Sequence, residues 1–314
     1  MKRKGYILFL VLTFCSLNYK SQDRTFLNPN QSLVSLNPSF AGSNGLFRAQ
    51  ALYHTLWPNL SGRSVAYAVA ADAKLKSINS GFALSYVHDV SLLGASTSDY
   101  LSLTYAYYFK LFQSKLEFIP SMQFTYGQTQ LDINNLPFGE GFHWHYYPSS
   151  YIRKVYFDMN AGFLLRHKAW YFGATAFHVN QPDVGMLGIE RLPTRYSFHT
   201  SYNFTFSQNA MLNVLLKFNT QEKLKYSSQG ENQNNGSAQA SLLLRKHFIV
   251  GTGYDSQYYY LLNMGYRARW FTASLVYAND LLSSDNVYDA WELNLAYQLR
   301  PKAQRAEVGN FEAW

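Results

Sequence analysis

Residues 195–217 read RYSFHTSYNFTFSQNAMLNVLLK, and large apolar residues alternate with polar ones through most of this stretch. A period of two is that of a β-strand, whose successive side chains point to opposite faces. The alternation stops at residues 207–209 and then resumes, although Leu215 interrupts the polar face. The stretch therefore predicts a β-hairpin with an apolar and a polar face. The apolar face includes Tyr196, Phe198, Tyr202, Phe204 and Phe206, and the polar face includes Ser197, His199, Ser201, Asn203 and Lys217.

The length of these two strands indicates a membrane environment. Both run beyond ten residues, whereas ordinary strands centre on about five or six. A strand that crosses a bilayer at a tilt needs about 9–11 residues, and aromatic residues gather where its outward face meets the membrane interfaces. A soluble sandwich shows a similar alternation, but the length and the aromatic face favour an outer-membrane barrel.

The composition agrees with a barrel that spans a membrane. Among 314 residues, aromatic residues make up 18% and charged residues only 15%, against about 25% charged residues in a typical soluble domain. The mean hydropathy is −0.22, as expected when a polar lumen balances an apolar exterior. The longest apolar run beyond the N-terminus, residues 65–71, is too short for a transmembrane helix. A closed sheet is the remaining way to satisfy the backbone in lipid.

Residues 1–21 have the pattern of a secretory signal peptide, with basic residues at positions 2–4 followed by an apolar run over 6–14. The only cysteine, Cys15, lies in this segment, and we expect it to be removed rather than acylated. Cleavage removes four basic residues and no acidic one, so the formal charge falls from +8 to +4. A charge this small gives no support to nucleic-acid binding.

The remaining chain divides into a periplasmic lead-in segment (22–46), a barrel (47–299) and a C-terminal tail (300–314). The lead-in is rich in turn residues, and we expect no strand in it. Phe40 leaves two possibilities for this segment, which are insertion into the periplasmic mouth or docking to a periplasmic partner. The fold class is all-β, a single closed antiparallel transmembrane barrel of about 14 strands. The expected strands are 47–56, 64–75, 80–90, 99–110, 115–130, 155–166, 169–178, 195–207, 211–221, 237–246, 248–254, 258–267, 270–278 and 290–299.

The connections alternate in length, as they do in barrels with short periplasmic turns and long external loops. The expected short turns are 76–79, 111–114, 167–168, 208–210, 247 and 268–269. The expected long links are 57–63, 91–98, 131–154, 179–194, 222–236 and 279–289. The link 255–257 is short where a long one is expected, so the register of 237–278 is left open. Basic residues in the short turns are suited either to lipid headgroups or simply to solvent.

Two clusters contain residue types found in catalytic or metal sites. His199, Ser201 and Asn203 have the side chains of a Ser-His-Asn hydrolase, but their alternation points them into the lumen, where we expect them to fill space. Glu140 and the histidines at 143 and 145 could ligate a metal, but no further pattern supports such a site. We therefore expect no catalysis, no metal and no cofactor.

The link at 131–154 is unusually aromatic, which indicates packing against the barrel mouth or a partner-binding patch. Its aromatic residues include Phe138, Phe142, Trp144, Tyr146 and Tyr147. In the lumen, Asp72, Lys217 and Glu292 are candidates to form ion pairs across the interior and to help fill it. No ring of like charge is evident that would make a pore selective.

Several segments in order along the chain resemble the PorP/SprF family of type IX secretion outer-membrane proteins of Bacteroidetes-type bacteria. These segments are Asn37-Pro38-Ser39-Phe40-Ala41-Gly42-Ser43, residues 48–57, 81–89, 103–108 and 171–178, and the closing stretch 291–297. Members of the family commonly have a His-Glu pair before the last strand, where this chain has Trp291 and Glu292.

The resemblance implies a non-enzymatic barrel that helps to export or attach particular secreted proteins such as adhesins. Its implied partners are other secretion components, outer-membrane lipid and the C-terminal region of an exported protein. We expect Asn37, Pro38 and Phe40 and the aromatic residues of 138–147 to bind partners. The alternative function is an outer-membrane pore or substrate-selective transporter.

Overall fold

The structure is a computed structural model that describes residues 26–43, 46–58, 63–111, 116–133, 151–186, 188–222, 233–256, 259–279 and 289–299. The expected signal peptide and C-terminal tail lie outside these ranges. None of the helices in the described ranges is long and apolar enough to cross a membrane.

The described chain is built from long strands with four short helical turns. The helical turns are α2 (Leu33–Leu36), η2 (Pro38–Phe40), η3 (Lys76–Ile78) and η4 (Leu92–Gly94). The strands are β1 (Phe47–Leu56), β2 (Ser64–Leu75), β3 (Ser80–Ser91), β4 (Ser96–Tyr107), β5 (Phe109–Leu111), β6 (Leu116–Asp132), β7 (Tyr151–His167), β8 (Trp170–Phe177), β9 (Arg195–Ser207), β10 (Ala210–Gln221), β11 (Gln233–Leu244), β12 (Phe248–Asp255), β13 (Tyr259–Arg267), β14 (Phe271–Asn279) and β15 (Ala290–Leu299).

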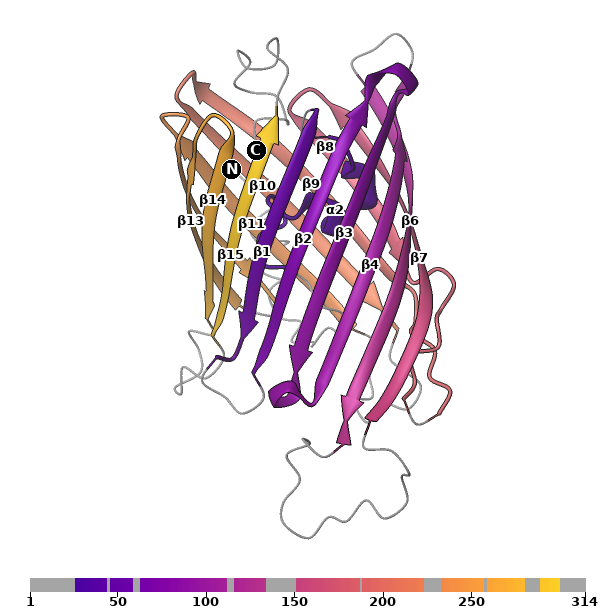
Figure 1. The fold of residues 1–314 in the computed structure, drawn as a ribbon. Coiled ribbons are helices and arrows are strands. Elements are labelled where there is room, and N and C mark those ends of the chain that lie inside the picture. The colour runs from indigo at the N-terminus through magenta and orange to yellow at the C-terminus, as the bar shows by residue number, and fades with distance from the viewer. Residues whose placement is uncertain are drawn as a thin grey trace, which may run out of the picture.

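The strands close into a single tilted antiparallel barrel (Figure 1). The last strand pairs with the first, in a register from Phe47 opposite Leu299 to Leu56 opposite Ala290. The short β5 continues β4 after a break at Tyr108, and both strands pair with β6. These two strands therefore share one position in the wall, and the predicted barrel of 14 strands is confirmed.

Some boundaries differ from the sequence prediction. The link expected at 91–98 shortens to 92–95, because Leu92 and Gly94 adopt positive φ angles of 51° and 92° and turn the chain tightly. β11 begins at Gln233, within a polar run that we expected to be part of a long link. The backbone ladder with β10 extends through this run, since hydrogen bonding between strands does not depend on apolar side chains.

The wall separates apolar from polar side chains as the hairpin pattern predicted. Tyr202 and Phe204 are 45% and 44% exposed on the outer face, whereas His199 and Asn203 are 2% exposed inside. Other strands place further outward aromatic and aliphatic residues in the same band, including Tyr67, Leu103, Phe157, Leu262 and Leu295. An apolar exterior of this kind matches the hydrocarbon of a bilayer.

The two ends of the barrel differ in their connections. At the end where β1 begins and β15 finishes, at the top of Figure 1, most consecutive strands are joined by a few residues. The opposite end carries the links 133–150, 178–194, 222–232 and 280–289. We call these the short-turn end and the long-link end. In bacterial barrels they face the periplasm and the exterior, respectively.

Candidate functional site: a plug in the lumen

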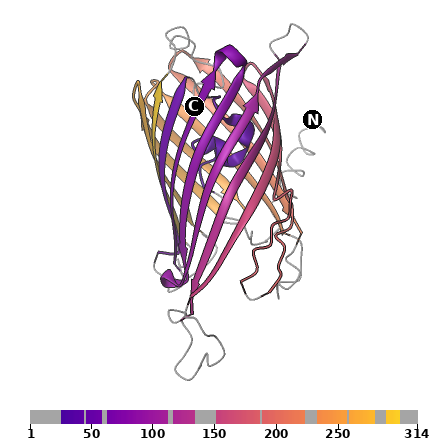
Figure 2. The same ribbon diagram turned by 45° about the vertical axis from the view of Figure 1, so that its right-hand side comes forward.

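Residues 26–43 fold inside the barrel, and we call this segment the plug. Its short helices α2 and η2 lie between the walls in both ribbon views (Figures 1 and 2). Nearly every plug residue is buried. Of the two arrangements expected for Phe40, the structure has insertion into the barrel, and the plug reaches beyond the mouth into the lumen. The plug contains no strand, as expected.

The first part of the plug is held by the last strand. Glu292 is fully buried on β15, and its two carboxylate oxygens accept hydrogen bonds from the backbone N–H groups of Leu27 (2.6 Å) and Asn28 (3.1 Å). His54, opposite Glu292 on β1, places Nδ1 3.3 Å from the same carboxylate. Gln239 on β11 donates to the Leu27 carbonyl at 2.8 Å. Hydrogen bonds to a carboxylate are among the stronger ones in proteins, so Glu292 is a main anchor of the plug.

Asn37 joins the middle of the plug to three strands. Its Nδ2 donates to the carbonyl of Phe163 on β7 (3.0 Å) and lies 3.4 Å from Nε2 of His199 on β9. Its Oδ1 accepts from the N–H of Ser39 (2.8 Å), which caps η2, while Pro38 occupies the start of that helix. Gly173 on β8 makes room, because a Cβ there would lie 2.9 Å from Asn37 Nδ2.

Phe40 forms the apolar centre of the plug. Its ring meets Tyr171 edge-on at 5.1 Å and lies 5.9 Å from the ring of His199. Leu33 from α2 and Leu164 from β7 belong to the same buried cluster. Burying a phenylalanine side chain contributes about 1.5–3 kcal/mol, so this contact stabilises the plug independently of its hydrogen bonds.

The end of the plug is fixed near the short-turn end of the barrel. The N–H of Gly42 donates to Asp72 Oδ2 on β2 (3.0 Å), and the hydroxyl of Tyr108 donates to the Ala41 carbonyl (2.7 Å). Gly42 has a φ of +74°, which a glycine adopts without strain. Gly81 on β3 allows the closest approach, since a Cβ there would lie 1.9 Å from the Ala41 oxygen.

The lumen-facing residues selected from the sequence have separate roles. Asp72 and Glu292 hold opposite ends of the plug, whereas Lys217 lies 3.6 Å from Asp255, a residue that sequence analysis did not select. Ser201 accepts a 2.7 Å hydrogen bond from Asn213 Nδ2, which also donates to Asn203. His199 instead contacts the plug.

Sequence reasoning also missed Arg48, His54, Tyr108 and Asn213 as plug or lumen contacts. Their positions on the inward-facing side of predicted strands were the available signal, but this signal does not distinguish a plug contact from any other lumen position. The proposed partner-binding residues Phe138, Phe142, Trp144, Tyr146 and Tyr147 lie outside the described residues, as do Glu140, His143 and His145. Within the described ranges, no group of three His, Cys, Asp or Glu side chains could hold a metal ion.

A closed barrel with an apolar exterior, a polar wall and a filled lumen defines an outer-membrane β-barrel protein with an internal plug. The family model of the type IX secretion system membrane protein PorP/SprF matches residues 18–297. The chain therefore belongs to the PorP/SprF family, and its location is the outer membrane.

Solved barrels resemble this chain only distantly. The outer membrane protein Omp33 of Acinetobacter baumannii shares 11% identity, with 81% of this chain and 98% of that chain covered and a TM-score of 0.46. The TodX deltaS2S3 mutant monoaromatic hydrocarbon channel shares 12% identity over 89% of this chain and 96% of its own, with a TM-score of 0.47. The translocator domain of autotransporter NalP from Neisseria meningitidis shares 10% identity over 95% of each chain, with a TM-score of 0.40. Likeness at this level carries no functional argument. The comparison with curated proteins found no match.

Proposed function

We propose that this barrel assists export or surface attachment of specific secreted proteins, such as adhesins, by binding rather than by catalysis. The supporting observation is the plug, whose hydrogen bonds reach strands on several sides of the lumen, including β2, β7, β11 and β15. Polar side chains such as Asp72, Asn37 and Glu292 thereby join the plug to the inner face of the wall. The surfaces left for binding are the links and the two ends of the barrel.

The proposed partners follow from the two different ends. The long-link end faces the exterior and is suited to the C-terminal region of an exported protein, with the aromatic residues of 138–147 as the proposed contacts. The short-turn end is suited to other type IX secretion components. Exposed cations there, including Lys76, Lys168 and Lys246, are also suited to lipid headgroups.

The contacts of the lumen residues support a binding role over hydrolysis. Acyl transfer by a serine requires a base within hydrogen-bond reach of its hydroxyl. In this structure His199 Nε2 lies beside Asn37, and its Nδ1 has no hydrogen-bond partner among the described residues. Ser201 is hydrogen-bonded by Asn213.

Deletion of the gene tests the proposal by comparing the secreted and surface proteomes with those of the parent strain. We expect loss of a small, defined set of large exported proteins and recovery with either the wild-type gene or a Ser201→Ala gene. An unchanged proteome would reject the export role. If the Ser201→Ala gene did not restore the exported proteins although the wild-type gene did, and the variant barrel reached normal amounts in the membrane, a catalytic role would be indicated.

Conductance of the purified barrel in a planar bilayer tests the pore alternative. We expect the plugged barrel to remain closed over most of the recording. A stable open state with selectivity among solutes would instead support a transporter.

A further inference from the structure

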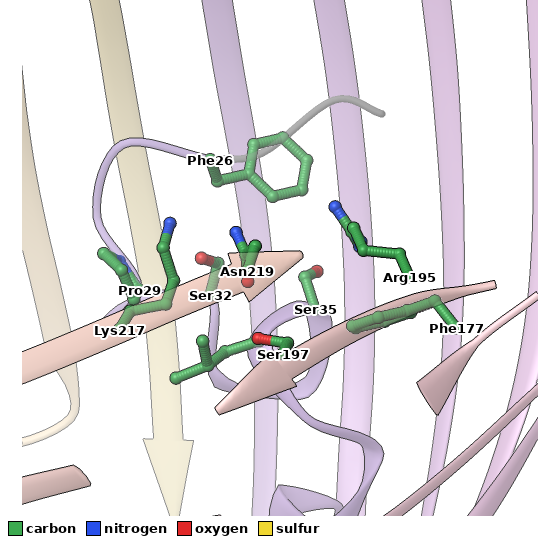
Figure 3. A pocket seen from close by; sticks show the side chains of 10 residues that line it. Phe26, Pro29, Ser32, Ser35, Phe177, Arg195, Ser197, Lys217 and Asn219 are labelled. Atoms are coloured by element: carbon green, nitrogen blue, oxygen red, sulfur yellow. The ribbon is translucent and has the colours of Figure 1, made fainter. Parts of the chain in front are cut away.

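The outer face of the barrel carries a groove of about 500 Å³ where the last strand meets the first. Its floor lies on β1 and β2, and its sides come from β3 and β4 and from β14 and β15, which are neighbouring strands in Figure 1. Small-molecule sites in proteins typically have volumes of about 300–1,000 Å³. The space inside the barrel between Phe26, Arg195 and Lys217 is only about 60 Å³ (Figure 3) and holds a few water molecules at most. The outer groove is therefore the better candidate for a ligand.

Small side chains form the floor of the groove. Ala49 and Ala71 lie opposite each other on β1 and β2, and Ala51 lies two residues further along β1. These alanines face outward, since their neighbours Arg48 and Asp72 are buried inside. The sides are formed by larger outward residues, which are Leu84, Tyr86 and Leu101 on one side and Phe271, Leu295 and Tyr297 on the other. The groove exists because outward side chains are small on two strands and large on the strands beside them.

The groove spans about half of the membrane. Toward the long-link end it stops at Tyr53 and Tyr67, whose ring centroids lie 5.4 Å apart. Toward the short-turn end the small side chains continue with Ala73, which lies opposite Phe47. The four residue steps of β2 from 69 to 73 rise about 13 Å along the strand, and half of the hydrocarbon is about 15 Å thick. Because the short-turn end faces the periplasm, the groove lies in the periplasmic leaflet.

A cation lies beside the groove at the short-turn end. Arg269 is exposed in the turn between β13 and β14, two residues before Phe271 of the groove. Its guanidinium carbon lies 4.7 Å from the centroid of the Trp270 ring. Tryptophan residues gather at the membrane–water interface, so this turn lies at the level of the lipid headgroups. A guanidinium is well suited to bind a phosphate there.

We propose that the groove holds one acyl chain of a phospholipid of the periplasmic leaflet, with the phosphate of that lipid bound by Arg269. Hydrocarbon surrounds the barrel on all sides, so association within it depends on packing and not on the hydrophobic effect. A chain in the groove contacts a floor and two sides, whereas a chain on the convex wall contacts one surface, and the additional contacts together favour the groove. Arg269 adds a charged contact to the same lipid.

A membrane-spanning helix of a partner protein fits the groove less well. Small side chains also allow transmembrane helices to pack closely. A spanning helix, however, crosses about 30 Å of hydrocarbon, and Tyr53 and Tyr67 close the groove within that distance. The half-membrane length and the cation at one end therefore favour a lipid.

A chain in the groove contacts both ends of the barrel sheet. Ala49 on β1 pairs with Tyr297 on β15, and both residues line the groove. A lipid that binds only the closed seam stabilises that seam by mass action. This inference does not depend on the export role, because lipid binding is measured on the isolated barrel.

Native mass spectrometry of the full barrel tests the proposal with palmitoyl-oleoyl phosphatidylglycerol as the probe. The barrel is delipidated in detergent and titrated with this lipid, and we expect one lipid to bind more tightly than all others. Dihexanoyl phosphatidylglycerol has the same headgroup but chains too short to fill the groove, so it should bind at least about tenfold more weakly. Equal affinity for the two lipids would overturn the acyl-chain site, and this comparison needs no variant.

Variants separate the groove and its cation from the rest of the surface. Ala49→Leu combined with Ala71→Leu fills the floor and should weaken binding of the long-chain lipid about tenfold or more. Ala161→Leu, at an outward position on β7, adds the same side chain away from the groove and should leave binding unchanged. Arg269→Gln should weaken binding about fivefold, whereas Lys168→Gln, in the turn between β7 and β8, should have no effect.

Hydrogen exchange reports the effect of the lipid on the seam. Exchange over 47–52 and 293–298 should slow when phosphatidylglycerol is added to the wild-type barrel but not when it is added to the variant with the filled groove. Lipid binding that is unaffected by both the filled groove and Arg269→Gln would contradict the assignment. Co-purification of a membrane-spanning protein that is lost only from the filled variant would assign the groove to that protein and overturn the lipid proposal.

Discussion

Glu292→Gln is expected to loosen the plug while the strands of the barrel wall remain paired. The side chain keeps its size, but one of the two oxygens that accept from Leu27 and Asn28 becomes an NH₂ group facing an N–H donor. A hydrogen bond to a charged group is worth about 1.5–3 kcal/mol and a neutral one about 0.5–1.5 kcal/mol. Two hydrogen bonds to a charged group are replaced by one neutral hydrogen bond, which costs about 2.5–4.5 kcal/mol.

This loss raises the equilibrium constant for plug opening. Each 1.4 kcal/mol is a factor of ten in an equilibrium constant, so amide exchange over residues 26–36 should accelerate roughly 60- to 1,600-fold. Hydrogen exchange measured by mass spectrometry on the barrel in nanodiscs reports this change, and the hairpin 195–221 provides the internal reference. Single-channel recordings should show more frequent opening.

The control for this prediction is Glu222→Gln, which removes the same charge at an exposed position after β10. It should leave exchange in the plug unchanged. If Glu292→Gln also left plug exchange unchanged while the reference hairpin remained protected, Glu292 would not be the anchor that its geometry indicates.

Three further changes test the other end of the plug and an external link. Gly81→Ala places a Cβ 1.9 Å from the backbone oxygen of Ala41 in the present geometry, so residues 41–43 should shift and exchange faster, and the barrel should conduct more often. Tyr108→Phe removes the 2.7 Å hydrogen bond to the Ala41 carbonyl and should raise exchange over 41–43 about fivefold, as expected for about 1 kcal/mol. At Asp183, a hydrogen bond from Lys154 and two backbone N–H groups lower the pKa of the carboxyl from its ordinary 3.8 to about 2. Because this pKa is lowered in the folded protein, the ionised carboxylate of Asp183 stabilises the link above pH 4, and the stabilisation is lost as the pH falls toward 2. Amides in 183–191 should therefore become less protected over that interval.

Two of these tests have a matched control. Gly188→Ala adds a Cβ with no atom within 4 Å and should leave plug exchange as in the wild type. Asp183→Asn should remove the acid dependence of the link. Unchanged protection in Gly81→Ala or Tyr108→Phe would contradict the docking of Ala41, and an acid transition that persists in Asp183→Asn would have to arise from another group.

The sequence predicted the wall because the wall depends on local properties. The alternation around Tyr202 and Phe204 assigned inner and outer faces correctly, since consecutive side chains in any strand point to opposite sides. The length of the strands indicated a bilayer. Because the hydrocarbon holds no water to hydrogen-bond a free strand edge, residues 290–299 were expected to pair with 47–56 and close the sheet, as they do.

The family resemblance drew on segments that meet around the plug. The stretch 37–43 forms the second half of the plug, and Gly81, Gly173 and Glu292 come from three further segments that carried the resemblance. Their sequence order gave no indication that they share one contact surface, because they lie on β3, β8 and β15.

The sequence by itself determined the closed barrel, its two faces and its unequal ends. Only the tertiary structure decided that residues 26–43 lie inside the lumen and which wall residues hold them. The physical reason is that this segment has no regular period, and its stabilising contacts connect positions as distant as Leu27 and Glu292, which are 265 residues apart. Such contacts exist only in the closed barrel, where β15 pairs with β1 and lies beside the start of the plug.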